Sequence, residues 1–259
     1  MIKAIFFDLD DTLIWDQKSV KEAMEATCKI AEARYGIDAV RLEDAVRVVA
    51  RNLYTSYETF EFTRMIGINP FEGLWGNFLE ETVNFRKLKN IIPTYRKDVW
   101  SLALMEMGVD DPEFGLKLGE QFPDERKKRP YVFEDTYKTL DKLKDDYQLL
   151  LMTNGSPDLQ HTKLELSPEL APFFEHIVIS GDYGKGKPDP SIFEHAMSLL
   201  SLRKDEVLMV GDNLLTDILG ANRSGIKSVW INRSNKVRNE IIPTYEIHHL
   251  DELIPILYR

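Results

Sequence analysis

The chain has 259 residues and a formal net charge of −10 at pH 7, with a sequence pI near 5.1. This acidic balance argues against nucleic acid and anionic membrane surfaces as partners, although a local cation can still attract an anionic substrate. Apolar residues make up 43% and charged residues 29%, ordinary values for a globular chain that is long enough for one large or two modest domains.

The first predicted element is a strand over residues 2–7, which is apolar apart from Lys3 and is typical of a strand buried on both faces of a parallel sheet. Three carboxylates follow at once: Asp8, Asp10 and Asp11. Ionised carboxylates this close repel one another unless a cation or a shared proton offsets the repulsion. The cluster therefore indicates a metal site or a catalytic site at the carboxyl end of a strand. A solvated acidic turn is the alternative for this stretch alone.

The next region, residues 16–130, shows helical spacing and no convincing strand. Helices are predicted from a capping box at Ser19–Glu22 to Gly36, over residues 42–53, and around 99–107 and 113–121. We interpret the region as an all-helical insert. Its aromatic residues are expected in its core: Trp75, Phe78, Phe85 and Trp100. The basic run over residues 126–129 is expected to be a solvated helix end.

After Pro130 the pattern alternates between strand and helix, which predicts a parallel α/β sheet flanked by helices. Strands are expected over residues 148–153, 176–180, 207–211 and 227–232. Helices are expected over residues 133–146, 191–200 and 217–224, with a short element and a closing helix in the tail from Pro243. The simplest organisation is a discontinuous core domain, residues 1–15 plus 131–259, with a helical cap domain of residues 16–130 inserted after the first strand.

Polar groups follow two of these later strands. Thr153 and Asn154 precede Gly155, and this turn can present a hydroxyl and backbone N–H groups to an anion. Alone the signal is weak, because Thr-Asn-Gly is also a common turn. Asp212 follows the strand over residues 207–211, and Asp217 at the next helix start is either an N-cap or a functional carboxylate.

A glycine-rich loop over residues 184–190 places Lys185 and Lys187 between two strands. Asp189 is expected to be a helix N-cap and Pro190 the first helical residue. An exposed loop with solvated lysines is the alternative interpretation.

Together these four sites resemble the motifs of the haloacid dehalogenase superfamily of hydrolases. Motif one resembles Asp8-Leu9-Asp10-Asp11-Thr12, motif two Thr153, motif three Lys187 before Pro188, and motif four Gly211-Asp212 with Asp217. The resemblance implies a Rossmann-like α/β core with a helical cap between the first two motifs. It also implies that the strands of motifs one, two and four lie side by side, so that the motifs converge on one crevice.

The resemblance further implies a mechanism. Asp8 would be the nucleophile and form an aspartyl-phosphate, while Asp10 would protonate the leaving oxygen and then activate a water. Magnesium would bind Asp8, the backbone carbonyl of Asp10 and Asp212 in an all-oxygen shell. Lys187 would offset charge between nucleophile and phosphate, and Asp217 would orient Lys187 or a metal-bound water.

The resemblance also implies that the transferring phosphoryl group would be held by Thr153 and by the backbone N–H groups near Leu9 and Asn154. Thr12 is expected to brace the motif-one turn. Asp11 departs from the glycine common at its position, and we interpret it as a turn residue. Lys185 rivals Lys187 but lacks the following proline.

We therefore expect a magnesium-dependent phosphatase for a small soluble phosphate monoester, with nucleoside monophosphate, sugar phosphate and phosphoserine all open. A haloacid dehalogenase is disfavoured because relatives of that type lack an aspartate at the position of Asp10. A phosphomutase of the same fold uses both aspartates and stays an alternative. A phosphoacceptor signalling domain shares the clustered aspartates, the threonine and the Lys-Pro, but is about half this length and lacks the insert.

The cap is expected to select the substrate, and Trp15, Arg64 and Ser156 are candidates to face the crevice, although ordinary structural roles suit each of them. The single cysteine, Cys28, excludes an internal disulfide framework and is expected to pack in a helix. No apolar run is long enough for a membrane span and no signal peptide precedes the first strand, so we expect a cytoplasmic protein.

Overall fold

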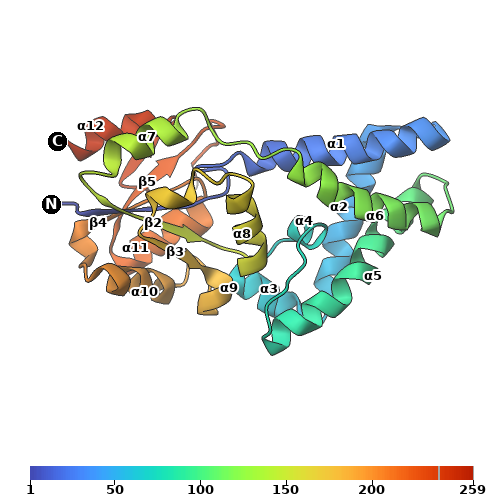
Figure 1. Ribbon diagram of the computed structural model, residues 1–259, viewed down its shortest axis with the longest axis horizontal. Coiled ribbons are helices and arrows are strands. Elements are labelled where there is room, and N and C mark those ends of the chain that lie inside the picture. The colour runs from blue at the N-terminus through green and yellow to red at the C-terminus, as the bar shows by residue number, and fades with distance from the viewer. Residues whose placement is uncertain (239, 259) are drawn as a thin grey trace. The chain divides into compact units, whose positions relative to one another are not determined.

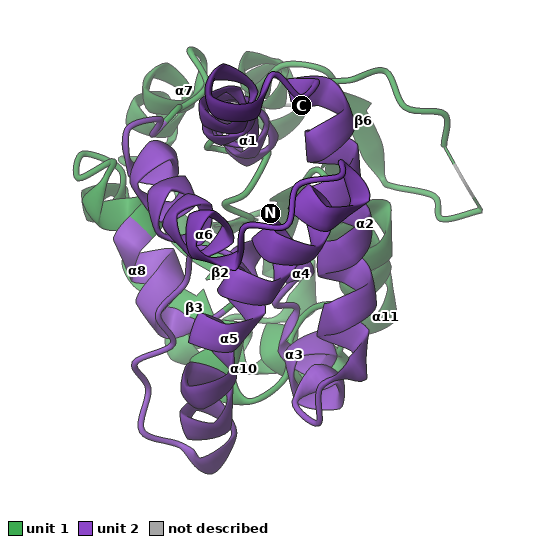
Figure 2. Cartoon of the chain, turned by 90° about the vertical axis from the view of Figure 1, so that its right-hand side faces the viewer, with its two compact units in different colours: residues 1–15, 131–155, 163–259 green, residues 16–130, 156–162 purple. Residues whose placement is uncertain are grey.

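The structure is a computed structural model that describes residues 1–238 and 240–258. The chain divides into two compact units (Figure 2). The core unit comprises residues 1–15, 131–155 and 163–259, and the helical unit comprises residues 16–130 with 156–162. The sequence assigned residues 156–162 to the core domain, whereas their contacts place them in the helical unit. The existence of two separately folding domains stays a prediction.

The core unit is built on a six-stranded sheet in the order β3-β2-β1-β4-β5-β6, and every neighbouring pair is parallel. Its strands are β1 (Ala4–Phe7), β2 (Gln148–Thr153), β3 (His176–Ile179), β4 (Val207–Gly211), β5 (Lys227–Ile231) and β6 (Tyr245–Ile247). The predicted α/β class is confirmed. Phe7 pairs with Leu151 on one side and Val210 on the other, so the carboxyl ends of β2, β1 and β4 reach the same edge.

Helices cover both faces of this sheet (Figure 1). They are α7 (Thr136–Leu143), α9 (Ser180–Tyr183), α10 (Pro190–Leu200), α11 (Leu219–Ser224) and α12 (Leu253–Leu257), and α8 (Pro157–Glu165) crosses into the helical unit. Because strand side chains alternate, Ile5 and Phe7 pack with α7 and α12, whereas Ala4 and Phe6 pack with α10 and α11. Burial on both faces explains why β1 is apolar throughout.

The helical unit begins and ends at neighbouring points of the core unit's backbone. The Trp15 N–H donates to the carbonyl of Tyr131 at 2.8 Å, and Ile14 forms an antiparallel bridge with Val132. The two crossing segments therefore pair with each other, and an insertion between them leaves the sheet intact. Trp15 also stacks on Phe133, with ring centroids 5.2 Å apart.

The helical unit contains six helices of its own. They are α1 (Asp16–Tyr35), α2 (Ala39–Ser56), α3 (Phe60–Ile66), α4 (Pro70–Gly73), α5 (Val83–Glu106) and α6 (Pro112–Lys127). The first part of α8 joins them, because Leu159 lies in their apolar core and the Asp158 carboxylate accepts from the Phe78 N–H at 3.1 Å. The aromatic residues expected in the core are buried there, as is Cys28.

Two details of the helix predictions are wrong. The helix predicted from Ser19 begins at Asp16, and Ser19 is buried inside it. The helix predicted from Asp217 begins earlier, with a π-helical turn, Leu214–Ile218, which contains Asp217 and whose N-cap is Asn213. Asparagine and aspartate cap helices almost equally well, so local preference could not choose between these two residues.

The N-cap expected at Asp189 is confirmed, because its side chain accepts from the Ser191 N–H at 2.9 Å and Pro190 opens α10. The expectation that the basic run is wholly solvated is wrong for Arg126. Its side chain is 2% exposed, pairs with Asp16, and lies 4.5 Å from the ring centroid of Trp75. The short element and closing helix expected in the tail correspond to β6 and α12.

Among the helices that the structure describes, none combines the length and apolar character needed to cross a membrane. The cytoplasmic location stays a prediction.

Candidate active site

The carboxylate of Asp8 lies directly after β1 and is held in place on both sides. The backbone N–H of Asp8 donates to the Val210 carbonyl at 3.0 Å, which continues the pairing of β1 with β4. The Thr12 hydroxyl donates to Asp8 Oδ2 at 3.0 Å and accepts from the Asp212 N–H at 3.0 Å. Thr12 therefore ties the motif-one turn to the end of β4, in line with its expected bracing role.

Lys187 lies between two carboxylates. Its Nζ is 2.7 Å from Asp8 Oδ1, 2.7 Å from Asp217 Oδ1 and 2.6 Å from the Met152 carbonyl oxygen. Burial lowers the pKa of this ammonium, but Asp217 and Asp8 outweigh that effect and the pKa stands above its ordinary value. Lys187 is therefore a permanent cation beside the carboxylate proposed as nucleophile.

The Asn154 side chain holds the loop that carries Lys187. Its Nδ2 donates to the Lys187 carbonyl at 2.9 Å, and its Oδ1 accepts from the Lys187 N–H at 2.8 Å. A Cβ on Gly186 would lie 2.8 Å from that Oδ1, so a larger residue there would have to displace the Asn154 side chain. The side chain is thus engaged with the loop, and substrate binding by Asn154 stays a prediction that concerns its backbone N–H. Lys185 pairs instead with Asp189 at 3.4 Å and is half exposed.

Three carboxylates form a cluster suited to a hard cation. Asp8, Asp212 and Asp217 each offer an oxygen, and these oxygens lie within 4.8 Å of one another. Burial raises the pKa of Asp8 to about 6, against the lowering effect of Lys187. Burial and the charges of Asp8 and Asp217 raise the pKa of Asp212 well above its ordinary range. A divalent cation would relieve this repulsion, and oxygen ligands are those that magnesium prefers.

The ion-pair partner of Asp10 is a residue that the sequence did not indicate as functional. Lys163 Nζ, from α8, lies 2.9 Å from both carboxylate oxygens of Asp10. A lysine on a helix is usually solvated, so its residue type carried no signal. Next to Asp10, Asp11 has φ 60° and donates its N–H to the Ile14 carbonyl at 2.8 Å. That left-handed conformation favours glycine and is tolerated by aspartate, in line with a turn residue.

Thr153 ends β2 and is fully buried. Its hydroxyl makes a long hydrogen bond of 3.4 Å to the Asn154 carbonyl. Its role in holding a phosphoryl group stays a prediction.

The three further residues named as candidates all have structural partners. Trp15 stacks on Phe133, Arg64 pairs with Glu61 at 2.7 Å in the helical unit, and Ser156 Oγ accepts from a backbone N–H of α8 at 3.2 Å. These contacts give each of the three residues a structural role that requires no substrate.

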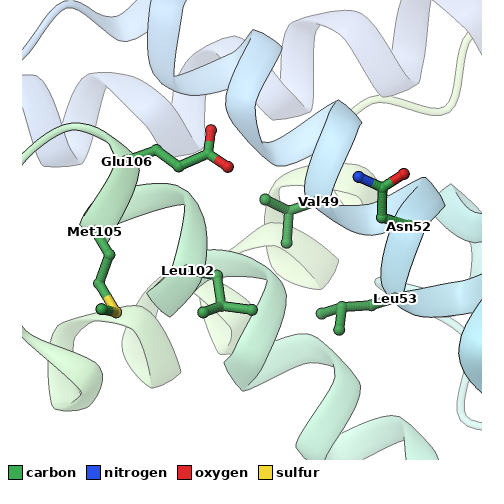
Figure 3. Close-up of a pocket in the computed structure, with 6 residues that line it drawn as sticks. All are labelled: Val49, Asn52, Leu53, Leu102, Met105 and Glu106. Atoms are coloured by element: carbon green, nitrogen blue, oxygen red, sulfur yellow. The ribbon is translucent and has the colours of Figure 1, made fainter.

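An open groove of about 440 Å³ lies between α2 and α5 of the helical unit (Figure 3). It is lined by Val49, Asn52, Leu53, Leu102, Met105 and Glu106. These lining residues lie outside the four motifs, and Glu106 is the ionisable member. A single carboxylate among apolar and amide side chains does not make a metal site or an acid–base pair.

The sheet order and the clustered motif residues define a hydrolase of the haloacid dehalogenase type. The chain belongs to this family, since the model of the haloacid dehalogenase-like hydrolases matches residues 2–225. The predicted family is confirmed. A phosphoserine phosphatase from Thermus thermophilus is 31% identical over 253 residues, which cover 97% of this chain and 98% of that protein.

Two further proteins are similar over nearly their whole length. The N-acylneuraminate-9-phosphatase of Mus musculus is 28% identical over 264 residues, covering 99% of this chain and 94% of that protein. The HAD-hydrolase YfnB from Bacillus subtilis, solved with magnesium bound, shares the fold with a TM-score of 0.69 at 23% identity, covering 100% of this chain and 99% of that one.

Proposed function

We propose that this protein is a magnesium-dependent phosphatase that hydrolyses a small soluble phosphate monoester through an aspartyl-phosphate on Asp8. The observation that carries the proposal is the position of Asp8, with Lys187 Nζ 2.7 Å from one carboxylate oxygen and the Thr12 hydroxyl 3.0 Å from the other. A carboxylate oriented in this way beside a fixed cation suits in-line attack on a phosphorus atom whose oxygens carry negative charge.

In the first step an Asp8 oxygen bonds to phosphorus while the bond from phosphorus to the ester oxygen breaks, and Asp10 gives the leaving oxygen its proton. In the second step Asp10 takes a proton from the water that attacks phosphorus, which releases phosphate and restores Asp8. Such positioned proton transfer typically contributes about 10²–10⁴-fold. Lys187 offsets the charge of nucleophile and phosphoryl group, and Asp217 orients Lys187.

The residues that would hold magnesium are Asp8, Asp212 and the backbone carbonyl of Asp10. When bound, this ion supplies positive charge to the transferring phosphoryl oxygens. Thr153 and the backbone N–H groups near Leu9 and Asn154 hold the same oxygens.

The nature of the ester is inferred from the relatives. Two relatives that match over nearly their whole length are named for phosphoserine and for N-acylneuraminate 9-phosphate, both small phosphate monoesters. The helical unit acts as the cap that selects among such esters. Asp10 favours this chemistry over dehalogenation, and the whole-length relatives argue against a signalling domain. The net charge of −10 supports the absence of a nucleic-acid partner.

The proposal is tested with Asp8→Asn and Asp10→Asn on two esters. Asp8→Asn abolishes turnover of both, because the nucleophile is missing. Asp10→Asn slows an alkyl phosphate far more than nitrophenyl phosphate, since nitrophenolate leaves without a proton. With nitrophenyl phosphate that variant releases a burst of nitrophenol and then stalls with a phosphoryl group on Asp8, which mass measurement detects.

Asp11→Asn is the matched control, because it makes the same change in the same turn outside the proposed machinery. It retains most of the activity. Equal loss of both esters in Asp10→Asn without a burst, or phosphate attached elsewhere than Asp8, refutes the assignment. Phosphoryl transfer back to the substrate in place of release would favour a phosphomutase.

A further inference from the structure

The contacts expected among the residues of the four motifs do not include the ion pair between Lys163 and Asp10. Lys163 Nζ is 2.9 Å from Asp10 Oδ1 and 2.9 Å from Oδ2. The lysine side chain is 4% exposed and the aspartate side chain 25%. The contact joins residues 153 positions apart in the chain. Asp8 and Asp10 therefore contact different buried lysines. Asp8 contacts Lys187 in the loop before α10, and Asp10 contacts Lys163 in α8.

Burial of Lys163 costs free energy unless another interaction compensates for it. An ammonium removed from water loses its hydration, and its four-carbon stem loses rotamer freedom. A surface salt bridge of the ordinary kind keeps its lysine in solvent and contributes little. Here the backbone of α8 is anchored next to the lysine, because Leu164 lies in the apolar cluster of the core unit that also contains Phe7. The ammonium is thus held beside Asp10 by the part of α8 that packs in the core unit.

A fixed cation on both oxygens restricts the orientation of a carboxylate. Asp10 follows the end of β1 in a turn, and its side chain is 25% exposed, so a contact with a buried ammonium limits the rotamers that it can adopt. Proton transfer to a leaving oxygen requires the carboxyl group at hydrogen-bonding distance, and a misplacement of about 1 Å can cost 10²-fold in rate.

We infer that Lys163 is a positioning residue that holds the carboxylate of Asp10 in the orientation required for proton transfer. The inference rests on the proposed function of Asp10. Lys163 itself does not touch the phosphoryl group in this assignment, which separates its role from that of Lys187.

The test compares Lys163→Met with Lys163→Arg. Methionine keeps an unbranched stem and removes the charge, whereas arginine keeps the charge. We expect Lys163→Met to lower kcat for an alkyl phosphate by roughly 10²-fold, with a much smaller effect on the nitrophenol burst, because only a basic leaving group needs the proton. Lys163→Arg recovers part of the loss. In the Asp10→Asn background, Lys163→Met has no further effect, since the group it positions is gone.

Lys144→Met is the control, because Lys144 follows α7 directly, is half exposed and pairs with Asp141. It leaves both rates unchanged. Equal loss of both esters in Lys163→Met, full activity of that variant, or an additive effect with Asp10→Asn would overturn the inference, given an unchanged circular-dichroism spectrum.

A readout independent of activity separates this inference from the proposed function. Crystal structures of the wild type and Lys163→Met should show Asp10 with a changed or multiple side-chain conformation in the variant, and Asp8 and Lys187 unchanged. An Asp10 side chain in the same single conformation refutes the positioning role even if the enzyme hydrolyses phosphate esters. Conversely, a wild type that hydrolyses no ester refutes the proposed function, whatever the conformation of Asp10.

Discussion

Lys187 and Asp217 form an ion pair in which each side chain is 1% exposed and Nζ lies 2.7 Å from Oδ1. Asp217 reaches this position because it lies inside the π-helical turn that follows β4, and because Gly211 has no Cβ, which would collide with the Asp217 carboxyl group. Its second oxygen accepts from the Asn213 N–H at 3.0 Å. The cation beside the proposed nucleophile is thus held by a carboxylate that is itself fixed by the backbone.

Asp217→Asn should destabilise the protein and reduce turnover. The substitution keeps the side-chain shape but leaves the buried Lys187 with Asp8 as its remaining carboxylate partner, and breaking a buried pair costs about 3 kcal/mol or more. Urea unfolding at pH 7 measures the change. Asp189→Asn is the control, because this partly exposed N-cap also becomes an asparagine, a residue that caps helices equally well. Equal stability of the two variants would contradict the importance of the pair.

Magnesium removal should abolish activity reversibly. Excess chelator stops turnover, added magnesium restores it, and the apo protein melts at a higher temperature once magnesium is present, because a ligand that binds only the folded state stabilises it. Calcium, which is larger and tolerates more ligands, should raise the melting temperature yet support little turnover. In Asp212→Asn the magnesium-dependent shift in melting temperature should disappear. Undiminished turnover in chelator would remove the metal from the mechanism.

Asp135→Asn should lower stability in a pH-dependent manner. Asp135 makes a bidentate pair with Arg233, at 3.0 and 2.9 Å, and accepts from the Leu250 N–H at 2.8 Å. Burial raises the pKa of this carboxyl, but these bonds and the charge of Arg233 outweigh burial and leave the pKa lowered. Hydrogen bonds to a charged group of this kind contribute about 2 kcal/mol.

The direction of the pH dependence of stability follows from the lowered pKa of Asp135. The ionised carboxylate stabilises the folded state above about pH 4, near the unfolded value, and this contribution is lost as the pH falls through the folded pKa. The difference in unfolding free energy between wild type and Asp135→Asn should therefore be constant near neutrality and shrink in acid. Asp141→Asn, an exposed change on α7, should alter stability by less than about 0.5 kcal/mol. A difference that grows as the pH falls would refute the assignment.

Gly115→Ala should destabilise the helical unit, because a Cβ on Gly115 would lie 2.8 Å from the Cα and the N of Ser101 in α5. Moving a helix backbone to relieve this overlap costs about 1–3 kcal/mol. Gly119→Ala is the matched control in the same helix, since its Cβ comes no closer than 3.3 Å to Arg96. Thermal unfolding followed by circular dichroism should give a lower Tm for Gly115→Ala than for Gly119→Ala. The same Tm in both would show that the two helices separate easily.

The sequence by itself determined the class of fold and the family. The apolar run of β1 predicts a strand covered on both faces, and the order of the motif residues from Asp8 to Asp212 predicts the family that the comparison confirms. These features depend on local periodicity and on residue types at strand ends, which a single chain displays directly. Asp11 in the left-handed region and Asp189 at the start of α10 are local features of the same kind.

Only the tertiary structure decided which charged side chains meet. Lys163 contacts Asp10 across 153 positions, and Lys187 contacts Asp8 across 179. A lysine on a helix has the same local pattern whether solvent or a carboxylate surrounds its ammonium. Arg126 illustrates the same point, since a basic run typical of a solvated helix end contains a guanidinium buried against Trp75 and Asp16. Burial and pairing of a charge depend on which elements pack around it, and packing of elements distant in the chain is absent from local sequence.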